Sequence, residues 1–93
     1  ITSADEDPGV LAACGVLRNE GFEVTLLAPD QNGSLPTELI EAAFTDDTIL
    51  VCLSAVNRFT GSLLAISEVS SLCRERDALF HLEWVWDVSS NST

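Results

Sequence analysis

The stretch Thr48-Ile-Leu-Val-Cys-Leu-Ser-Ala-Val56 is the most strand-like segment of the sequence. Its apolar character is nearly continuous, which is typical of a strand that is buried on both faces of a parallel sheet. A strand with one solvent-exposed face would instead alternate between polar and apolar residues. We therefore expect this segment to lie inside an α/β domain with helices on both sides of the sheet.

Strand and helix patterns alternate on either side of this segment. Asp7 and Pro8 indicate a helix start, and Gly21 indicates the end of that helix. Pro36 opens a second helix, and residues 62–76 have the spacing of a third. The expected strands cover residues 1–3, 23–28, 48–56 and 78–85. The order β-α-β-α-β-α-β predicts a three-layer α/β fold with a parallel sheet of about four strands and right-handed crossover helices.

The loops that follow the strands are where a ligand would be expected. In open parallel sheets, ligands bind beyond the carboxyl ends of the strands. This rule selects residues 4–8, 29–33, 57–62 and 84–90. Of these loops, the third contains Arg58, which is either an anion anchor or an ordinary exposed arginine. The acidic run from Asp5 to Asp7 is either a cation site or the acidic start of a helix.

Composition narrows the possible partners. The chain of 93 residues is long enough for one domain, and 46% of its residues are hydrophobic. It has 15 acidic residues against four basic ones, which gives a net charge of −11. All four basic residues are arginine. Nucleic acid and anionic membranes are therefore not expected as partners. The acidity fits a solvated surface, a salt-adapted protein, or a region whose positive complement lies on a partner.

The cysteines and the single histidine do not form a metal motif. Cys14, Cys52 and Cys73 are widely spaced, so we expect no metal site and interpret them as small core residues. His81 falls inside a strand pattern, where a structural role is expected. An odd number of cysteines favours a reducing compartment, cytoplasmic or mitochondrial matrix. No signal peptide or membrane span is expected, and a first residue other than methionine suggests a fragment, a processed chain or a trimmed one.

Several collinear stretches resemble the cysteine desulfurases, which are fold-type I pyridoxal-phosphate enzymes of the class V aminotransferase type. The stretches are Gly21-Phe-Glu-Val-Thr-Leu-Leu-Ala-Pro-Asp-Gln-Asn-Gly33, Glu41-Ala-Ala-Phe-Thr-Asp-Asp-Thr-Ile-Leu-Val51, Val56-Asn57 with Gly61, and Leu72-Cys-Arg-Glu-Arg76 leading to His81. The resemblance implies the middle of the large, cofactor-binding domain, about a quarter of such an enzyme. It also implies a parent that mobilises sulfur from L-cysteine for iron–sulfur cluster assembly.

The resemblance weakens at the positions where the family contacts its cofactor. Asp7 stands where the family stacks a histidine on the pyridine ring, and Arg58 stands where it has an asparagine near the ring oxygen. Glu83 replaces the aspartate that holds the pyridinium nitrogen. Trp86 replaces a glutamine, and the neighbouring Trp84 replaces a small residue. Only Glu83 retains the family's chemistry, so we expect this chain to bind no pyridoxal phosphate and to contain no catalytic residue.

Three functions stay open at this point. The first is an inactive cysteine desulfurase-like segment, because no lysine is present to form the Schiff base with the cofactor. The second is a piece of a working enzyme completed by other segments. The third is a stand-alone, non-catalytic acidic α/β binding or interaction module. In domain terms, residues 1–88 are interpreted as a partial cofactor-binding domain and residues 89–93 as a polar tail. A homodimer or the remainder of a larger chain is the expected partner.

Overall fold

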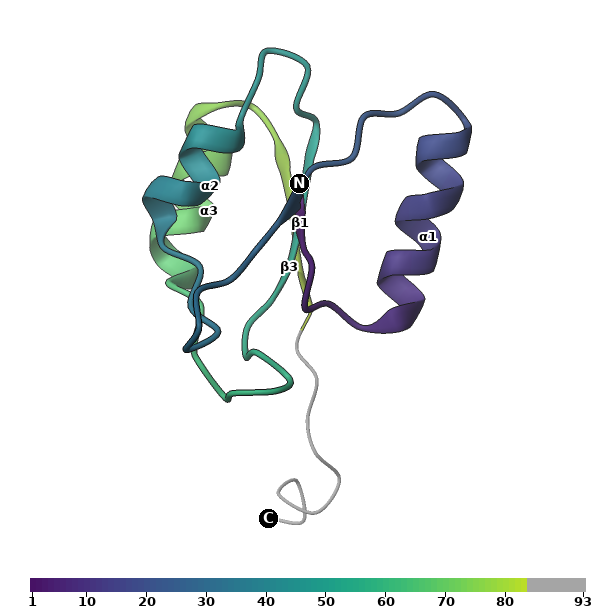
Figure 1. Cartoon of the computed structure of the whole chain (residues 1–93). Coiled ribbons are helices and arrows are strands. Elements are labelled where there is room, and N and C mark those ends of the chain that lie inside the picture. The colour runs from purple at the N-terminus through teal and green to yellow at the C-terminus, as the bar shows by residue number, and fades with distance from the viewer. Residues whose placement is uncertain (84–93) are drawn as a thin grey trace.

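A computed structural model describes residues 1–83 of the chain (Figure 1). The strands are β1 (Thr2–Ser3), β2 (Leu26–Leu27), β3 (Leu50–Ser54) and β4 (Leu79–Glu83). The helices are α1 (Pro8–Asn19), α2 (Thr37–Ala43) and α3 (Ile66–Glu75). Within these residues the four strands form one sheet in the order β2-β1-β3-β4, and every pair is parallel. The predicted β-α-β-α-β-α-β order and parallel sheet are confirmed.

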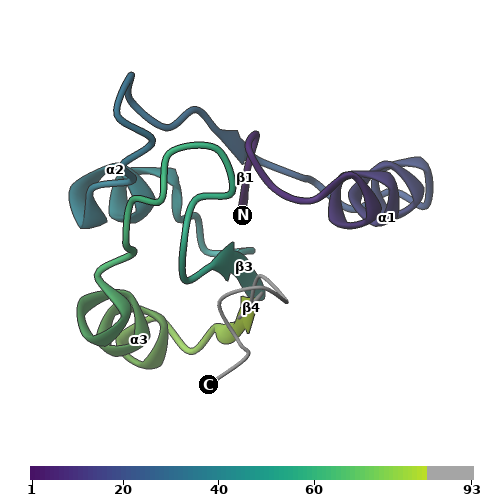
Figure 2. The ribbon, with the colours of Figure 1, turned by 90° about the horizontal axis from the view of Figure 1, so that it is seen from below.

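The helices divide unequally between the two faces of the sheet. Helices α2 and α3 lie side by side on one face, and α1 lies on the other (Figures 1 and 2). This is the predicted three-layer arrangement. Viewed along the strands, α1 sits beside β1, while β3 and β4 have no described helix on that side (Figure 2).

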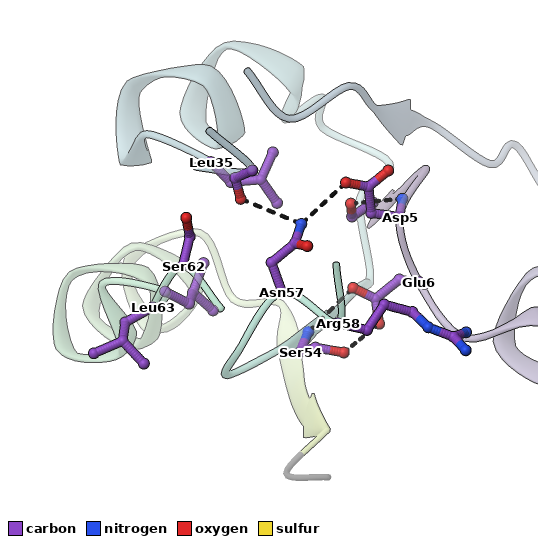
Figure 3. A pocket seen from close by; sticks show the side chains of 11 residues that line it. Asp5, Glu6, Leu35, Ser54, Asn57, Arg58, Ser62 and Leu63 are labelled. Atoms are coloured by element: carbon purple, nitrogen blue, oxygen red, sulfur yellow. Dashed lines mark hydrogen bonds between the residues drawn. The ribbon is translucent and has the colours of Figure 1, made fainter. Parts of the chain in front are cut away.

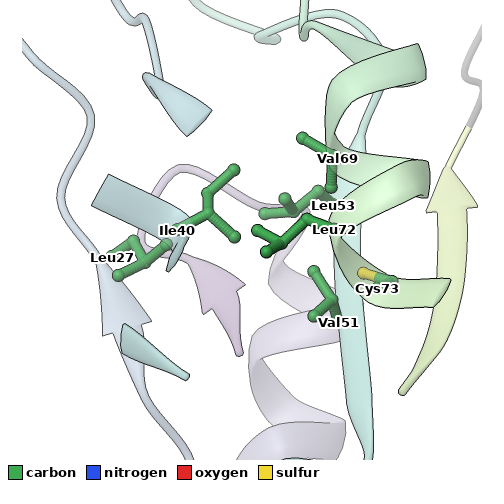
Figure 4. Packing of buried hydrophobic residues seen from close by; sticks show 7 residues of the cluster. All are labelled: Leu27, Ile40, Val51, Leu53, Val69, Leu72 and Cys73. Carbon is green, nitrogen blue, oxygen red and sulfur yellow. The ribbon is translucent and has the colours of Figure 1, made fainter. Parts of the chain in front are cut away.

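The hydrophobic core lies between the sheet and the α2–α3 layer (Figure 4). Val51 and Leu53 project from β3 into this layer and are fully buried. They meet Ile40 of α2 and Val69 of α3, which are also fully buried. The apolar residues of α3 recur at helical spacing, which presents one continuous stripe to the sheet. These contacts are the only substantial core within residues 1–83, so they determine how the sheet is held.

The prediction that the central strand is buried on both faces is wrong. Val51 and Leu53 are buried, but Leu50, on the opposite face, is 38% exposed. The reason is that no helix among residues 1–83 covers β3 and β4 on the α1 side (Figure 2). Two leucines in the segments predicted as helices are also exposed, Leu39 at 38% and Leu63 at 79%. Leu63 precedes the first turn of α3 and pairs as an isolated bridge with Val56, so it has no helix position to point it inward.

Most elements are shorter than their patterns predicted. Strand β2 has two residues where residues 23–28 were expected, and α3 begins at Ile66 instead of residue 62. Gly21 does end α1 in a left-handed conformation, with φ of 100°, as predicted. Trp84, Trp86 and the polar tail 89–93 lie outside the described residues. No helix among residues 1–83 is long and apolar enough to cross a membrane.

Candidate functional site

Asn57 joins three loops at the carboxyl ends of the strands (Figure 3). Its side-chain amide donates to Asp5 Oδ2 at 3.0 Å, in the loop after β1, and to the Gly33 carbonyl at 3.3 Å, in the loop after β2. Its Oδ1 accepts from the backbone amides of Phe59 and Thr60 at 2.8 and 3.0 Å. The structure therefore brings together three of the four loops that the sheet rule selected. The fourth, residues 84–90, lies outside the described residues.

The loops after β2 and β3 approach each other closely at Gly33. This residue is buried, with φ of 78°, and a Cβ atom at its position would overlap the side chain of Thr60. The Ser62 hydroxyl also donates to the Asn32 carbonyl. A glycine is required here both for its backbone conformation and for the space. The Asn32-Gly33 dipeptide is thus part of the loop contact.

Glu6 links the loop after β1 to the end of β3. It is 6% exposed, and its carboxylate accepts from the Ser54 hydroxyl at 2.6 Å and from the Ser54 amide at 3.2 Å. A buried carboxylate with two donors is satisfied as a structural group. Asp5 is likewise held by Asn57. Two of the three residues of the acidic run that was considered as a cation site are therefore engaged in contacts within the protein. No group of three or more metal-binding side chains gathers among residues 1–83.

Asp7 and Arg58, two of the four predicted cofactor positions, contact each other. Arg58 Nη1 lies 3.5 Å from Asp7 Oδ1, and the two side chains are 47% and 64% exposed. The guanidinium also lies over the Phe59 ring, 5.4 Å from its centroid. The sequence indicated both residues separately but gave no sign that they pair, because they are far apart along the chain. The pair spans the top of the sheet between the loops that precede α1 and α3.

Glu83, the third predicted cofactor position, is bound to a neighbour on its own strand. Its Oε1 lies 2.9 Å from His81 Nε2, and both side chains are on the α1 side of β4. Cys52 pairs in register with His81 on the adjacent strand. Burial raises the pKa of the Cys52 thiol, and the carboxylates of Glu6 and Glu83 raise it further. A thiol held in its protonated form is a poor nucleophile.

The three joined loops enclose very little space. The cavity among Asp5, Glu6, Gly33, Asn57 and Arg58 has a volume of about 20 Å³, which is about that of one water molecule. Its walls carry carboxylates, amides and hydroxyls that are already hydrogen-bonded to one another. The sequence selected Asp5 and Glu6, through the loop of residues 4–8 and the acidic run, but it missed Ser54 as a member of this cluster. The only signal for Ser54 was its position at the end of a strand.

Comparison with known families gives one consistent result. The model of the class-V aminotransferase family matches residues 1–91. Cysteine desulfurase IscS of Shewanella sediminis is 48% identical over 83 residues, and IscS of a further Shewanella species is 45% identical over the same length. Each alignment covers 89% of this chain and 20% of the relative. The chain thus spans about a fifth of the length of the curated relatives that it matches.

Solved structures agree with the sequence matches. A structure described as SspA in complex with cysteine superimposes with a TM-score of 0.83 at 33% identity, covering 87% of this chain and 23% of that one. DndA from Streptomyces lividans gives a TM-score of 0.82 at 33% identity, covering 88% and 23%. A NifS-like protein gives 0.84 at 26% identity, covering 94% and 24%. In each case, the match is to one segment of a much longer chain.

Proposed function

Since the chain belongs to the class-V aminotransferase family, we propose that it is a scaffold segment of a cysteine desulfurase-like protein and does not itself hold pyridoxal phosphate. The observation that carries the proposal is the Asp7–Arg58 contact. The residues at the family's stacking-histidine and ring-asparagine positions bind each other here. Asp7, Arg58, Glu83 and Trp86 are thus proposed as former cofactor positions.

The geometry of the loop end does not fit the cofactor. The cavity, of about 20 Å³, holds about one water molecule and is partly open, so pyridoxal phosphate would have to lie mostly outside it or push the loops apart. Opening the cavity would break the bonds of Asn57 to Asp5 and Gly33. These bonds join separate loops, so a ligand would have to replace all of them at once.

The charge at the loop end opposes the cofactor as well. Asp5, Glu6 and Asp7 lie within one loop, and Arg58 is the single basic side chain that lines the cavity. That guanidinium is already paired with Asp7. Carboxylates that surround a site disfavour a phosphate-bearing ligand through direct repulsion. Glu83, the position that would hold the pyridinium nitrogen, has its carboxylate engaged by His81 at 2.9 Å.

The chain also lacks the nucleophile that the family's chemistry needs. It contains no lysine, so no side-chain amine can form a Schiff base with the cofactor. The chemistry that the group supplies when bound is the stabilisation of a carbanion by the pyridinium ring. Nothing among residues 1–83 is arranged to assist it.

The proposal is tested by titrating the purified chain with pyridoxal phosphate and L-cysteine. Full-length IscS of Shewanella sediminis is the positive control. We expect no saturable visible band and no cysteine-dependent sulfide from the chain. Borohydride trapping followed by mass spectrometry locates any adduct, since the α-amino group of Ile1 is the only aliphatic amine. Saturable binding together with sulfide release would refute the proposal, whereas an adduct confined to Ile1 without sulfide release would agree with it.

A second candidate function is favoured by a different observation. The sheet face on the α1 side is partly uncovered and apolar, with Leu79 75% exposed. An exposed apolar surface of this kind is typical of an interaction site. We therefore retain the stand-alone, non-catalytic interaction module as the alternative. A monomer with sharp, cooperative unfolding would favour it, whereas a chain that aggregates would argue against it.

A further inference from the structure

The loop after β2 contains a dipeptide that is chemically labile in unrestrained chains. Asn32 is followed by Gly33, and Asn32 is exposed. In an Asn-Gly pair, the main-chain nitrogen of the glycine can attack the side-chain carbonyl carbon of the asparagine, because a glycine has no side chain to hinder the approach. Asn32 is the only asparagine of the chain that precedes a glycine.

The peptide unit that would react is held at both ends. The Gly33 amide donates to the Asp30 carbonyl at 2.8 Å, and the Asn32 carbonyl accepts from the Ser62 hydroxyl in the loop after β3. The Asn32 amide also donates to Asp30 Oδ1 at 2.8 Å. The Gly33 nitrogen can attack Asn32 only after losing the proton that it now donates to Asp30. All of these partners lie within residues 30–62, so the restraint belongs to the described segment itself.

The loop after β3 keeps this turn in place. Asn57 donates to the Gly33 carbonyl at 3.3 Å. The Thr60 side chain fills the space beside the Gly33 α-carbon, where a Cβ atom would overlap it. Gly33 itself is buried. Rotation of the Asn32–Gly33 peptide therefore requires the two loops to separate, which is a local opening of the structure and not global unfolding.

We propose that Asn32 is a site of spontaneous deamidation, that the contact between the loops after β2 and β3 restrains the reaction, and that the isoaspartate product prevents this contact from re-forming. Isoaspartate lengthens the main chain next to Gly33, which has no room to move because Thr60 lies against it. It also adds a carboxylate to the turn that already contains Asp30. The product therefore opposes the loop contact both by its length and by its charge.

The reaction consumes only water. The deprotonated Gly33 nitrogen forms a bond to Asn32 Cγ, and the bond from Cγ to the side-chain nitrogen breaks, so that ammonia leaves and a succinimide remains. Water then opens the succinimide at either carbonyl carbon. Opening at the former side-chain carbonyl gives aspartate. Opening at the main-chain carbonyl gives isoaspartate, in which the side-chain methylene has become part of the main chain.

Mass spectrometry of the 93-residue chain, incubated at mildly alkaline pH, measures the reaction. Cleavage after Glu23 and Glu38 releases residues 24–38, in which Asn32 is the only asparagine. A synthetic peptide of residues 24–38 gives the unrestrained rate. We expect Asn32 to deamidate at least about tenfold more slowly in the folded chain than in the peptide, because it reacts only during local opening. Equal rates, or a peptide that stays intact, would overturn the proposal.

Substitutions test whether the loop contact is the restraint. Ser62→Ala removes the hydroxyl that holds the Asn32 carbonyl, so it should speed deamidation about two- to tenfold. Ser71→Ala is the matched control, because Ser71 is exposed on α3, and it should leave the rate unchanged. Ile40→Val lowers global stability through the core and leaves the loop residues intact, so it should not change the rate either. No acceleration by S62A, or an equal acceleration by I40V, would overturn the proposal.

The effect of the product on the loop contact is measured separately. Ion exchange isolates the isoaspartate form, because it carries an added negative charge, and electron-transfer fragmentation identifies it. This form should unfold at a lower urea concentration than the intact chain. Asn32→Asp is the control for charge, because it adds the carboxylate without lengthening the main chain, and it should lower the midpoint less. An isoaspartate form as stable as the intact chain, or no less stable than N32D, would overturn the proposal.

Discussion

The two halves of this molecule, one on each side of the sheet, differ in how many apolar side chains they bury. On one side, α2, α3 and the loops before them pack against the sheet and bury Val51, Leu53, Ile40 and Val69. We call this side the closed half. On the other side, α1 contributes no buried residue. Both sides are rich in apolar residues, but only the closed half buries them fully. Apolar composition therefore predicts which surfaces need cover but not whether the same chain provides it.

The largest effect is expected when two leucines of β3 are compared. Leu53 is fully buried in the α2–α3 layer, whereas Leu50, on the α1 side of the sheet, is 38% exposed. Leu53→Ala should lower the free energy of unfolding by about 2–5 kcal/mol, whereas Leu50→Ala should lower it by about 1–2 kcal/mol. Urea denaturation at concentrations that keep the chain monomeric measures both.

The two stability losses can be compared directly because both residues are leucines on the same strand. Equal losses would mean that the α1 side is packed as well as the other, which would remove the contrast between the halves. If the L53A chain is too unstable to measure, Ile40→Val on α2 replaces it, with an expected loss of about 0.5–1.5 kcal/mol.

A pair of glycines sharpens the contrast inside the closed half. Gly33 and Gly61 have nearly the same backbone conformation, with φ of 78° and 77°. A Cβ on Gly33 would overlap Thr60, whereas a Cβ on Gly61 would meet nothing within 4 Å. Gly61→Ala should therefore cost only the left-handed conformation, about 1–2 kcal/mol. Gly33→Ala should cost about 1–3 kcal/mol more, because the two loops must separate.

Thermal or urea unfolding of the two alanine variants measures this difference directly. If both glycines cost the same, the approach of the loops after β2 and β3 is loose, and the small cavity at the sheet end could open for a ligand. That result would weaken the argument against cofactor binding as well. A larger loss for G33A supports a rigid loop contact.

Much of the fold could be predicted from the sequence, because strand and helix patterns alternate clearly. The order of elements, the parallel sheet and the end of α1 at Gly21 followed from local rules. The exposure of Leu50 could not be predicted, because it depends on whether a helix covers that face of the sheet. Leu63 was also assigned wrongly to the third helix, since the helical spacing continues past the point where α3 begins.

The candidate site was predictable only in part. The sheet rule selected the loops that Asn57 joins, and the family resemblance selected Asp7, Arg58 and Glu83. Neither source indicated that Asp7 binds Arg58, that Glu83 binds His81, or that Glu6 reaches Ser54. Contacts between loops depend on side-chain positions in three dimensions, and a single sequence carries no pattern for them. The role of these positions toward pyridoxal phosphate stays a proposal.

The smallest expected effect concerns the contact that links the two halves. Asp7 precedes α1, and Arg58 precedes α3. Because the two side chains are 64% and 47% exposed, solvent screening limits their coupling to about 0.2–1 kcal/mol. A double-mutant cycle with Asp7→Asn and Arg58→Gln measures this coupling and cancels the effect of Asp7 on the helix dipole. The coupling should shrink as salt is added.

The size of that coupling decides how the pair acts. A weak coupling means that the pair contributes little to stability. The closed half would then hold together without help from the loop before α1. A coupling above about 2 kcal/mol, far beyond that of an exposed pair, would instead show α1 firmly tied to the closed half. The contrast between the halves would then fail at this contact.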